Sequence, residues 1–143
     1  MNFISIFMTR IEEAVDLFDN GYVCSQAVFA VFCEEFGLSK SDAFKIGACF
    51  GSGMRQAEVC GACTGALMAI GLKHGDDKEV CNELSNRFFS QFKKENGSFI
   101  CRDLLECDIS TPEGVEKARN NNLFKEICPK MVASAVEITE KII

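Results

Sequence analysis

Apolar residues recur at helical spacing along almost the whole chain, and this pattern constrains the fold more than any other feature. In the first stretch the apolar stripe consists of Ile4, Phe7, Met8, Ile11, Ala14, Val15 and Phe18. Residues three and four apart lie on one face of a helix, and no segment shows the apolar–polar alternation of a half-buried strand. The 143 residues therefore predict an all-α fold, a single-domain bundle of six or seven helices covering residues 1–143.

Capping residues, glycines and prolines mark where these helices begin and end. We expect helices at residues 5–19 or 9–19, 24–36, 39–50 or 41–50, 60–73, 77–96 with a start at 76 or 77, 101–106, 111–119 and 128–142. Thr111-Pro112 is a strong start signal, because proline at the first helical position lacks an amide that would be unpaired there anyway. The run Asn120-Asn121-Asn122 is expected to interrupt the helix that begins there.

Charge and hydropathy exclude several kinds of partner. Lys and Arg number 15 and Asp and Glu 21, a net charge of −6, which argues against a surface that collects phosphates, so nucleic acid is not an expected partner. The apolar run from Ala66 to Leu72 is far shorter than the ~20 residues that a membrane span needs. No basic residue precedes the apolar start of the chain, so no secretory signal is expected. These features predict a cytoplasmic protein without a membrane span.

Nine cysteines are unusual for a chain of this length and composition. An odd number does not suit a closed framework of disulfides, and in a reducing compartment cysteines are more often catalytic, redox-active or metal-binding. Cys33, Cys49 and Cys81 lie in predicted helix interiors among apolar residues. Free cysteine is commonly buried in such surroundings, which keep it inert. We therefore expect these three to be structural.

Four other cysteines, Cys24, Cys60, Cys101 and Cys128, fall at or beside predicted helix N-termini. A helix start presents unpaired N–H groups and a partial positive charge, which favour an anion such as a thiolate. The pKa of a thiol placed there is expected to fall, and the thiolate is both the nucleophile and the metal ligand. Helix starts are numerous in an all-α chain, so placement by chance is the alternative.

Cys60-Gly61-Ala62-Cys63 forms a C-x-x-C pair at the start of a predicted helix. In dithiol–disulfide exchange the outer thiolate attacks and the inner thiol resolves the mixed disulfide. The βαβ context that usually accompanies this motif is missing, so only the local chemistry is predicted, with metal binding as the alternative.

Two pairs of glycines, Gly47 with Gly51 and Gly61 with Gly65, are four residues apart. On a helix each pair lines one face and lets another backbone approach closely. The alternative, in which Gly51-Ser52-Gly53 cradles a phosphate, lacks the Gly-Lys-Ser/Thr that would follow in such a loop.

At these residues the sequence resembles the bacterial family named for its C…GCAxxG…C…C pattern, whose core motif reads C-G-A-x-x-G. Residues 60–65 read C-G-A-C-T-G, and the family's other cysteines match Cys24, Cys101 and Cys128 over roughly residues 20–140. Cys63 occupies a variable position of the motif, and Cys107 has no counterpart. The resemblance implies a redox or thiol-dependent role for the four matched cysteines.

The leading hypothesis is a thiol–disulfide redox protein, acting as a thiol-dependent oxidoreductase that requires no cofactor. Cys60 would attack, and Cys24, Cys101, Cys128 or Cys63 would resolve the mixed disulfide. The partner would be a redox protein or a small thiol.

Two other hypotheses remain. In the first, Cys24, Cys60, Cys101 and Cys128 form a thiolate cage for zinc or an iron–sulfur cluster. In the second, the protein is a non-enzymatic helical adaptor, as a monomer or a homodimer, whose cysteines mostly fill the core.

Overall fold

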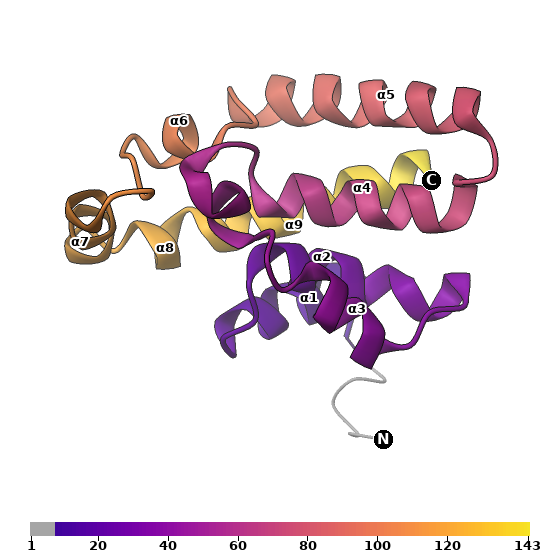
Figure 1. The fold of residues 1–143 in the computed structure, drawn as a ribbon, viewed down its shortest axis with the longest axis horizontal. Coiled ribbons are helices and arrows are strands. Elements are labelled where there is room, and N and C mark those ends of the chain that lie inside the picture. Colours follow the sequence, from indigo (N-terminus) through magenta and orange to yellow (C-terminus); the bar gives the residue numbers. More distant parts are fainter. Residues whose placement is uncertain (1–7) are drawn as a thin grey trace.

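The computed structural model describes residues 8–143, which form nine α-helices (Figure 1). The helices are α1 (Arg10–Asp19), α2 (Cys24–Cys33), α3 (Lys40–Gly47), α4 (Gly61–His74), α5 (Lys78–Asn96), α6 (Cys101–Leu105), α7 (Pro112–Asn120), α8 (Leu123–Glu126) and α9 (Cys128–Ile142), with two tighter or wider turns, η2 (Glu34–Phe36) and η3 (Gly53–Ala57). Only α6 and α8 are shorter than eight residues, which leaves seven longer helices. Over residues 8–143 no strand forms, and one antiparallel bridge joins Val59 to Ile100. The predicted all-α fold of six or seven helices is confirmed.

Side-chain caps set four of the helix starts, those of α1, α3, α5 and α7, where the sequence placed them. Thr9 accepts a hydrogen bond from the backbone N–H of Glu12, so the first helix begins there. The alternative start at Ser5 lies outside the described residues. Ser39 and Thr111 accept equivalent bonds from backbone N–H groups at the starts of α3 and α7. Each such cap satisfies one of the N–H groups that a helix start leaves unpaired.

The segment between α3 and α4 differs from the prediction. Helix α3 ends at Gly47, whereas the sequence placed its end at Phe50. The backbone then enters the left-handed region at Ser52, Met54 and Arg55, with φ of 54°, 58° and 60°. Residues other than glycine rarely adopt this conformation, so neither propensity nor hydrophobic pattern predicts it. The four-residue α8 was not predicted either.

Helix α2 is the centre of the bundle and packs most extensively on α4, with α1, α3 and α9 also against it. The glycines of α4 permit this contact: a Cβ on Gly65 would lie 2.6 Å from the carbonyl oxygen of Ser25. Gly47 likewise lies against Gln26 of α2, where a Cβ would be 3.3 Å from the Gln26 backbone. The expectation of close backbone approach is confirmed for Gly61 and Gly65. It is wrong for Gly47 and Gly51 as a pair on one helix face, because α3 ends at Gly47 and Gly51 lies against the side chain of Val23. Figure 1 shows α5 running antiparallel beside α4 across the hairpin that joins them.

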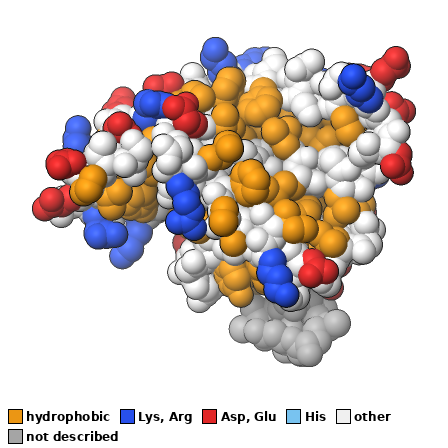
Figure 2. Space-filling model, in the orientation of Figure 1, with side chains coloured by type: hydrophobic (Ala, Val, Ile, Leu, Met, Phe, Trp, Pro, Cys, Tyr) orange, Lys and Arg blue, Asp and Glu red, His pale blue; other side chains and the backbone are white. Residues whose placement is uncertain are grey.

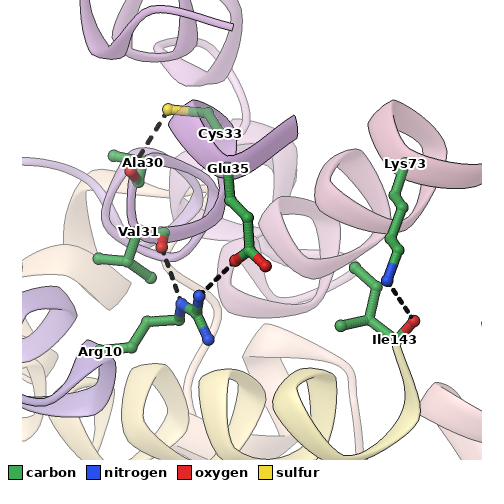
Figure 3. Close-up of polar contacts among 7 residues, drawn as sticks. All are labelled: Arg10, Ala30, Val31, Cys33, Glu35, Lys73 and Ile143. Carbon is green, nitrogen blue, oxygen red and sulfur yellow. Dashed lines mark hydrogen bonds and ion pairs between the residues drawn. The ribbon is translucent and has the colours of Figure 1, made fainter. Parts of the chain in front are cut away.

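Polar contacts join helices that are far apart in sequence (Figure 3). Arg10 of α1 donates from Nε to the carbonyl oxygen of Val31 at 2.9 Å and from Nη2 to Glu35 at 2.6 Å. Its guanidinium lies 4.6 Å from the ring centroid of Phe32. An exposed ion pair alone contributes about 1 kcal/mol or less, so the value of Arg10 lies in orienting α1 on α2. At the other end, Lys73 donates to the carbonyl oxygen of Ile143 at 2.9 Å.

The surface carries charged side chains of both signs. Figure 2 shows hydrophobic side chains gathered over the middle of the visible face, with Lys, Arg, Asp and Glu around its margin. Over the described residues, only Tyr22, Ile46 and Met54 are large hydrophobic residues classed as exposed. None of the helices in residues 8–143 combines the length and apolar character needed to span a membrane.

Gly65→Ala is expected to lower the free energy of unfolding by about 1–3 kcal/mol, because the new methyl group would collide with the α2 backbone. Gly71→Ala, on an exposed position of the same helix with nothing within 4 Å, is the matched control and should stabilise by about 0.5–1 kcal/mol. Urea denaturation followed by circular dichroism measures both. Equal stability of the two variants would show that α2 and α4 are not in close contact at Gly65.

Candidate functional site

Four helix N-termini that carry cysteines meet at one cavity. Cys24, Cys101 and Cys128 are the first residues of α2, α6 and α9, and Cys60 is the N-cap of α4. All four side chains line a cavity of about 610 Å³. The predicted positions at helix starts are confirmed, and folding brings these separate starts to the same place.

Two buried or half-buried polar side chains fix the start of α2 and with it Cys24. Gln26 accepts a hydrogen bond from the backbone N–H of Val23 at 3.0 Å and donates to the carbonyl oxygen of Phe44 at 2.8 Å. Ser25, which is fully buried, donates to the carbonyl oxygen of Gly47 at 2.7 Å. A buried hydroxyl needs such a partner to offset the loss of water. These bonds hold the start of α2 against α3 and the loop that follows it.

A short antiparallel pairing aligns the starts of α4 and α6. Cys60 donates its backbone N–H to Phe99 at 2.8 Å, and Cys101 donates its backbone N–H to Glu58 at 2.6 Å. Beside this bridge Arg102 forms an ion pair with Glu58. The two cysteines are 41 positions apart in the sequence, yet this bridge fixes their backbones side by side.

Glycines make room for the sulfur atoms. A Cβ on Gly61 would collide with Cys24 Sγ and lie 3.0 Å from the carbonyl oxygen of Phe50. Gly53, with φ of 62°, would place a Cβ 2.8 Å from the Cβ of Cys101. The glycine after Cys60 therefore lets the sulfur of Cys24 lie against the first turn of α4. Gly53 likewise leaves room for the side chain of Cys101.

The left-handed segment η3 directly follows Ser52, which lines the same cavity. Ser52, Met54, Arg55 and Ala57 all have positive φ, and each such residue other than glycine costs about 1–2 kcal/mol relative to an ordinary conformation. The segment brings the backbone of Ser52 into hydrogen-bonding contact with the Cys24 sulfur. Backbone strain of this kind persists where the surrounding structure over-determines it, commonly at functional sites. Sequence analysis identified the Gly51-Ser52-Gly53 break but missed this conformation.

Cys24 and Cys60 are the most closely coupled of the cysteines. Their thiols lie within hydrogen-bonding reach of each other, and this contact, followed by burial, raises the pKa of Cys24 well above its ordinary value. For Cys60 the contact with Cys24 is the largest influence and lowers the pKa, but Cys63 and burial together carry it well above the ordinary value. Both thiols of the pair are therefore neutral at pH 7.

Cys101 and Cys128 lie on the same cavity and are also held as neutral thiols. Burial, followed by like-charge repulsion from Cys24, raises the pKa of each to about 12. The expectation that helix starts would lower the thiol pKa is wrong for Cys24, Cys60, Cys101 and Cys128. Burial disfavours a charged sulfur, and neighbouring sulfurs disfavour a second charge, so both effects oppose the helix termini.

Cys63 lies one turn into α4, behind Cys60. It is fully buried, with 0% of its surface exposed, and does not line the cavity. Its thiol is close enough to Cys60 to affect the Cys60 pKa. The C-x-x-C pair therefore has one sulfur at the cavity wall and one in the core.

The other cysteines occupy varied environments. Cys33 is buried and its thiol donates to Ala30 at 3.3 Å (Figure 3), as the prediction of a structural cysteine requires. Cys81 is half-buried and donates to the carbonyl oxygen of His74 at 3.1 Å. Cys49 is exposed, so its predicted burial is wrong, because α3 ends at Gly47 and leaves it in a turn. None of the nine cysteines is in a disulfide.

The four cavity cysteines do not form a ligand cluster in this conformation. Between residues 8 and 143, no group of three or more His, Cys, Asp or Glu side chains has an arrangement that could hold a metal ion. A tetrahedral thiolate site needs four sulfurs at about 2.3 Å from one point. The geometry thus gives the thiolate-cage hypothesis no support beyond the shared cavity.

The remaining walls of the cavity are mostly aromatic and aliphatic. They include Phe18, Leu104, Ile109, Phe124 and Met131. One charged side chain, that of Arg119 near the end of α7, also lines the cavity described here. No hydrophobic periodicity or motif marks Arg119 in the sequence, and it was not among the predicted site residues.

Comparison with known proteins identifies one family. The model of a family described as "Putative redox-active protein (C_GCAxxG_C_C)" matches residues 22–142. No curated protein and no solved structure gives a significant match. The matched range includes all four cavity cysteines and Cys63.

The raised thiol pKa values predict the pH dependence of alkylation. With a pKa of about 12, Cys101 and Cys128 should react with iodoacetamide roughly a thousandfold more slowly at pH 8 than a small thiol with a pKa of about 8.5. Their rates should rise about tenfold per pH unit from pH 8 to 10 without levelling off, because the thiolate fraction grows over that whole range.

Peptide mass spectrometry gives the rate at each cysteine separately, with exposed Cys49 as a measure of reagent reactivity. Circular dichroism at pH 10 checks that the protein remains folded. A rate at Cys101 or Cys128 that reaches a plateau below pH 9 contradicts the burial of these thiols.

Proposed function

This chain belongs to the C_GCAxxG_C_C family, and on that premise we propose that it is a thiol–disulfide redox protein whose exchanging pair is Cys24 and Cys60. The observation that carries the proposal is the contact between these two thiols at the wall of a cavity. Two thiols in contact can close to a disulfide where the backbone allows a Cα–Cα distance of about 4.4–6.8 Å.

Access favours Cys24 over Cys63 as the partner of Cys60. Cys24 and Cys60 both line the cavity, and Cys24 is half-buried, whereas Cys63 is fully buried and lies outside the lining. The resolving thiol attacks Cys60 Sγ from the side opposite the departing substrate sulfur. Cys24 contacts Cys60 at the cavity wall, so it is the thiol placed to make this attack.

The reaction consists of two exchanges. The Cys60 thiolate attacks a substrate disulfide, forms a Cys60 mixed disulfide and releases one substrate thiol, which takes up a proton. Cys24 then loses its proton and attacks Cys60 Sγ, which closes the Cys24–Cys60 disulfide and releases the second substrate thiol. Two electrons pass from the protein dithiol to the substrate disulfide.

We assign the first attack to Cys60 because of its position. Cys60 is the N-cap of α4 and lines the cavity, and a helix N-terminus favours a thiolate over a thiol. Cys101 and Cys128 line the same cavity and have pKa values of about 12. The pKa values of Cys24 and Cys60 are raised too, so the contact between the thiols of Cys24 and Cys60, and not their acidity, distinguishes this pair.

The thiolate-cage hypothesis is tested directly by composition. Under the proposed function, protein purified anaerobically should contain well below one equivalent of zinc or iron per chain and show no visible absorption band. Elemental analysis and a visible spectrum measure these quantities. One tightly bound equivalent of zinc or iron that is lost in Cys101→Ser and in Cys128→Ser would contradict the exchange proposal and show a metal site.

Mild oxidation should produce a disulfide between Cys24 and Cys60. Cys60→Ser should abolish it and leave no mixed disulfide at Cys24, whereas Cys24→Ser should accumulate a mixed disulfide on Cys60, because the nucleophile remains but the resolving thiol is gone. Peptide mapping without reduction, after acid quenching, identifies each product. The serine hydroxyl preserves much of the local packing in both variants.

Two further variants serve as controls. Cys49→Ser removes an exposed thiol away from the cavity lining and should leave Cys24–Cys60 formation unchanged. Cys63→Ser should also leave the disulfide in place. A Cys60–Cys63 disulfide as the main product of the unsubstituted protein would assign the exchange to the C-x-x-C pair. Undiminished reduction of a substrate disulfide by Cys60→Ser would favour the adaptor hypothesis.

A further inference from the structure

We propose that the cavity binds a small, largely apolar disulfide that carries an anionic group, with Arg119 holding the anion while Cys60 and Cys24 exchange with the disulfide. This inference rests on the proposed function and adds the class of substrate. It follows from three features of the cavity: its depth, its walls and its one charged side chain.

Depth favours a small molecule over a protein. Cys60 and Cys101 each expose only 7% of their surface, so their sulfurs lie below the molecular surface. The cavity volume of about 610 Å³ falls within the roughly 300–1,000 Å³ typical of small-molecule sites. A disulfide on the surface of a folded protein could not descend to these sulfurs without local unfolding.

The walls favour an apolar body. The elements around the thiols contribute aromatic and aliphatic side chains, among them Phe18 from α1, Leu104 from α6, Phe124 from α8 and Met131 from α9. A polar group placed against such a wall loses its water without gaining a hydrogen bond, which costs about 1–3 kcal/mol per group. A substrate with many amide and ammonium groups, such as oxidised glutathione, is therefore disfavoured.

Arg119 provides the site for an anion. It is the one charged residue among those that line the cavity, and it is exposed. Within residues 8–143 its guanidinium takes part in no hydrogen bond or ion pair. A guanidinium binds a carboxylate through two parallel hydrogen bonds. Because Arg119 is exposed, the anionic group stays near water while the apolar body enters the cavity.

The chemical step balances without another reactant. The substrate R–S–S–R accepts two electrons and two protons and leaves as two R–SH, while the Cys24 and Cys60 thiols lose two protons and two electrons and become a disulfide. The first S–S bond to form joins Cys60 to one half of the substrate, whose anionic group is held by Arg119 during the attack of Cys24.

Two aromatic disulfides, one anionic and one neutral, test the proposal. One is 5,5′-dithiobis(2-nitrobenzoate), which has a carboxylate on each ring, and the other is 4,4′-dithiodipyridine, which is neutral at pH 8. Stopped-flow absorbance measures the rate of Cys24–Cys60 disulfide formation. This rate is taken from the kinetic phase that is absent in Cys60→Ser, and peptide mapping confirms the product. Each rate is divided by the rate of the same probe with N-acetylcysteine, which removes the intrinsic reactivity of the probe.

Arg119→Gln should reduce the normalised rate with the carboxylate probe roughly fivefold to tenfold, the range expected for a charged hydrogen bond that is partly exposed to water. The rate with the neutral probe should stay the same. Arg87→Gln is the matched control, because this substitution changes the net charge by the same amount. Arg87 is exposed on α5 and does not line this cavity. Arg119→Lys should retain part of the rate advantage of the carboxylate probe over the neutral probe, because lysine keeps the positive charge.

The outcomes separate this inference from the function on which it rests. An unchanged probe preference in Arg119→Gln, or an equal loss in Arg87→Gln, overturns the anion site while Cys24–Cys60 exchange still stands. A higher normalised rate of Cys24–Cys60 oxidation with the disulfides of insulin or with oxidised glutathione than with either aromatic probe overturns the apolar small-molecule class. Failure of every probe to produce the Cys24–Cys60 disulfide overturns the proposed function itself.

Discussion

The contact between α2 and α4 is the constraint on which the rest of the structure depends. Gly65 lets the backbones of the two helices meet at Ser25, and Gly61 lets the sulfur of Cys24 lie over the first turn of α4. Protein interiors are packed as densely as organic crystals, so a methyl group at either glycine would have to displace a helix. The stability of the bundle and the position of the Cys24 sulfur therefore depend on the same two residues.

Two opposing effects set the pKa values of the cavity thiols, and burial with like-charge repulsion outweighs the helix N-termini. A helix terminus stabilises a nearby charge by about 0.3–1 kcal/mol, or up to ~2 kcal/mol in partly buried positions, which corresponds to about one pKa unit. Burial and like-charge repulsion shift a pKa by several units, and they raise the pKa of Cys101 and Cys128 to about 12. The cluster therefore rests as neutral thiols, and negative charge is most favourable on one sulfur at a time.

Long-range contacts assemble the cavity from pieces of chain that have little structure of their own. The bridge between Val59 and Ile100 aligns Cys60 with Cys101. The left-handed turn of η3 presents backbone to Cys24 and Cys101, although its positive φ values are unfavourable for Ser52, Met54 and Arg55. Conformations of that kind persist only when surrounding contacts hold them. The cavity is thus a property of the packed bundle and not of any one motif.

The sequence by itself determined the helices, their caps and the placement of Cys24, Cys60, Cys101 and Cys128 at helix starts, because periodicity, capping and proline position act over a few residues. Only the tertiary structure decided that these starts share one cavity, that Cys24 is the neighbour of Cys60, and that Arg119 lies beside them. It also decided the sign of the thiol pKa shifts and the exposure of Cys49. Burial and sulfur–sulfur proximity arise from packing between segments tens of residues apart, and local sequence rules contain no information about such distances.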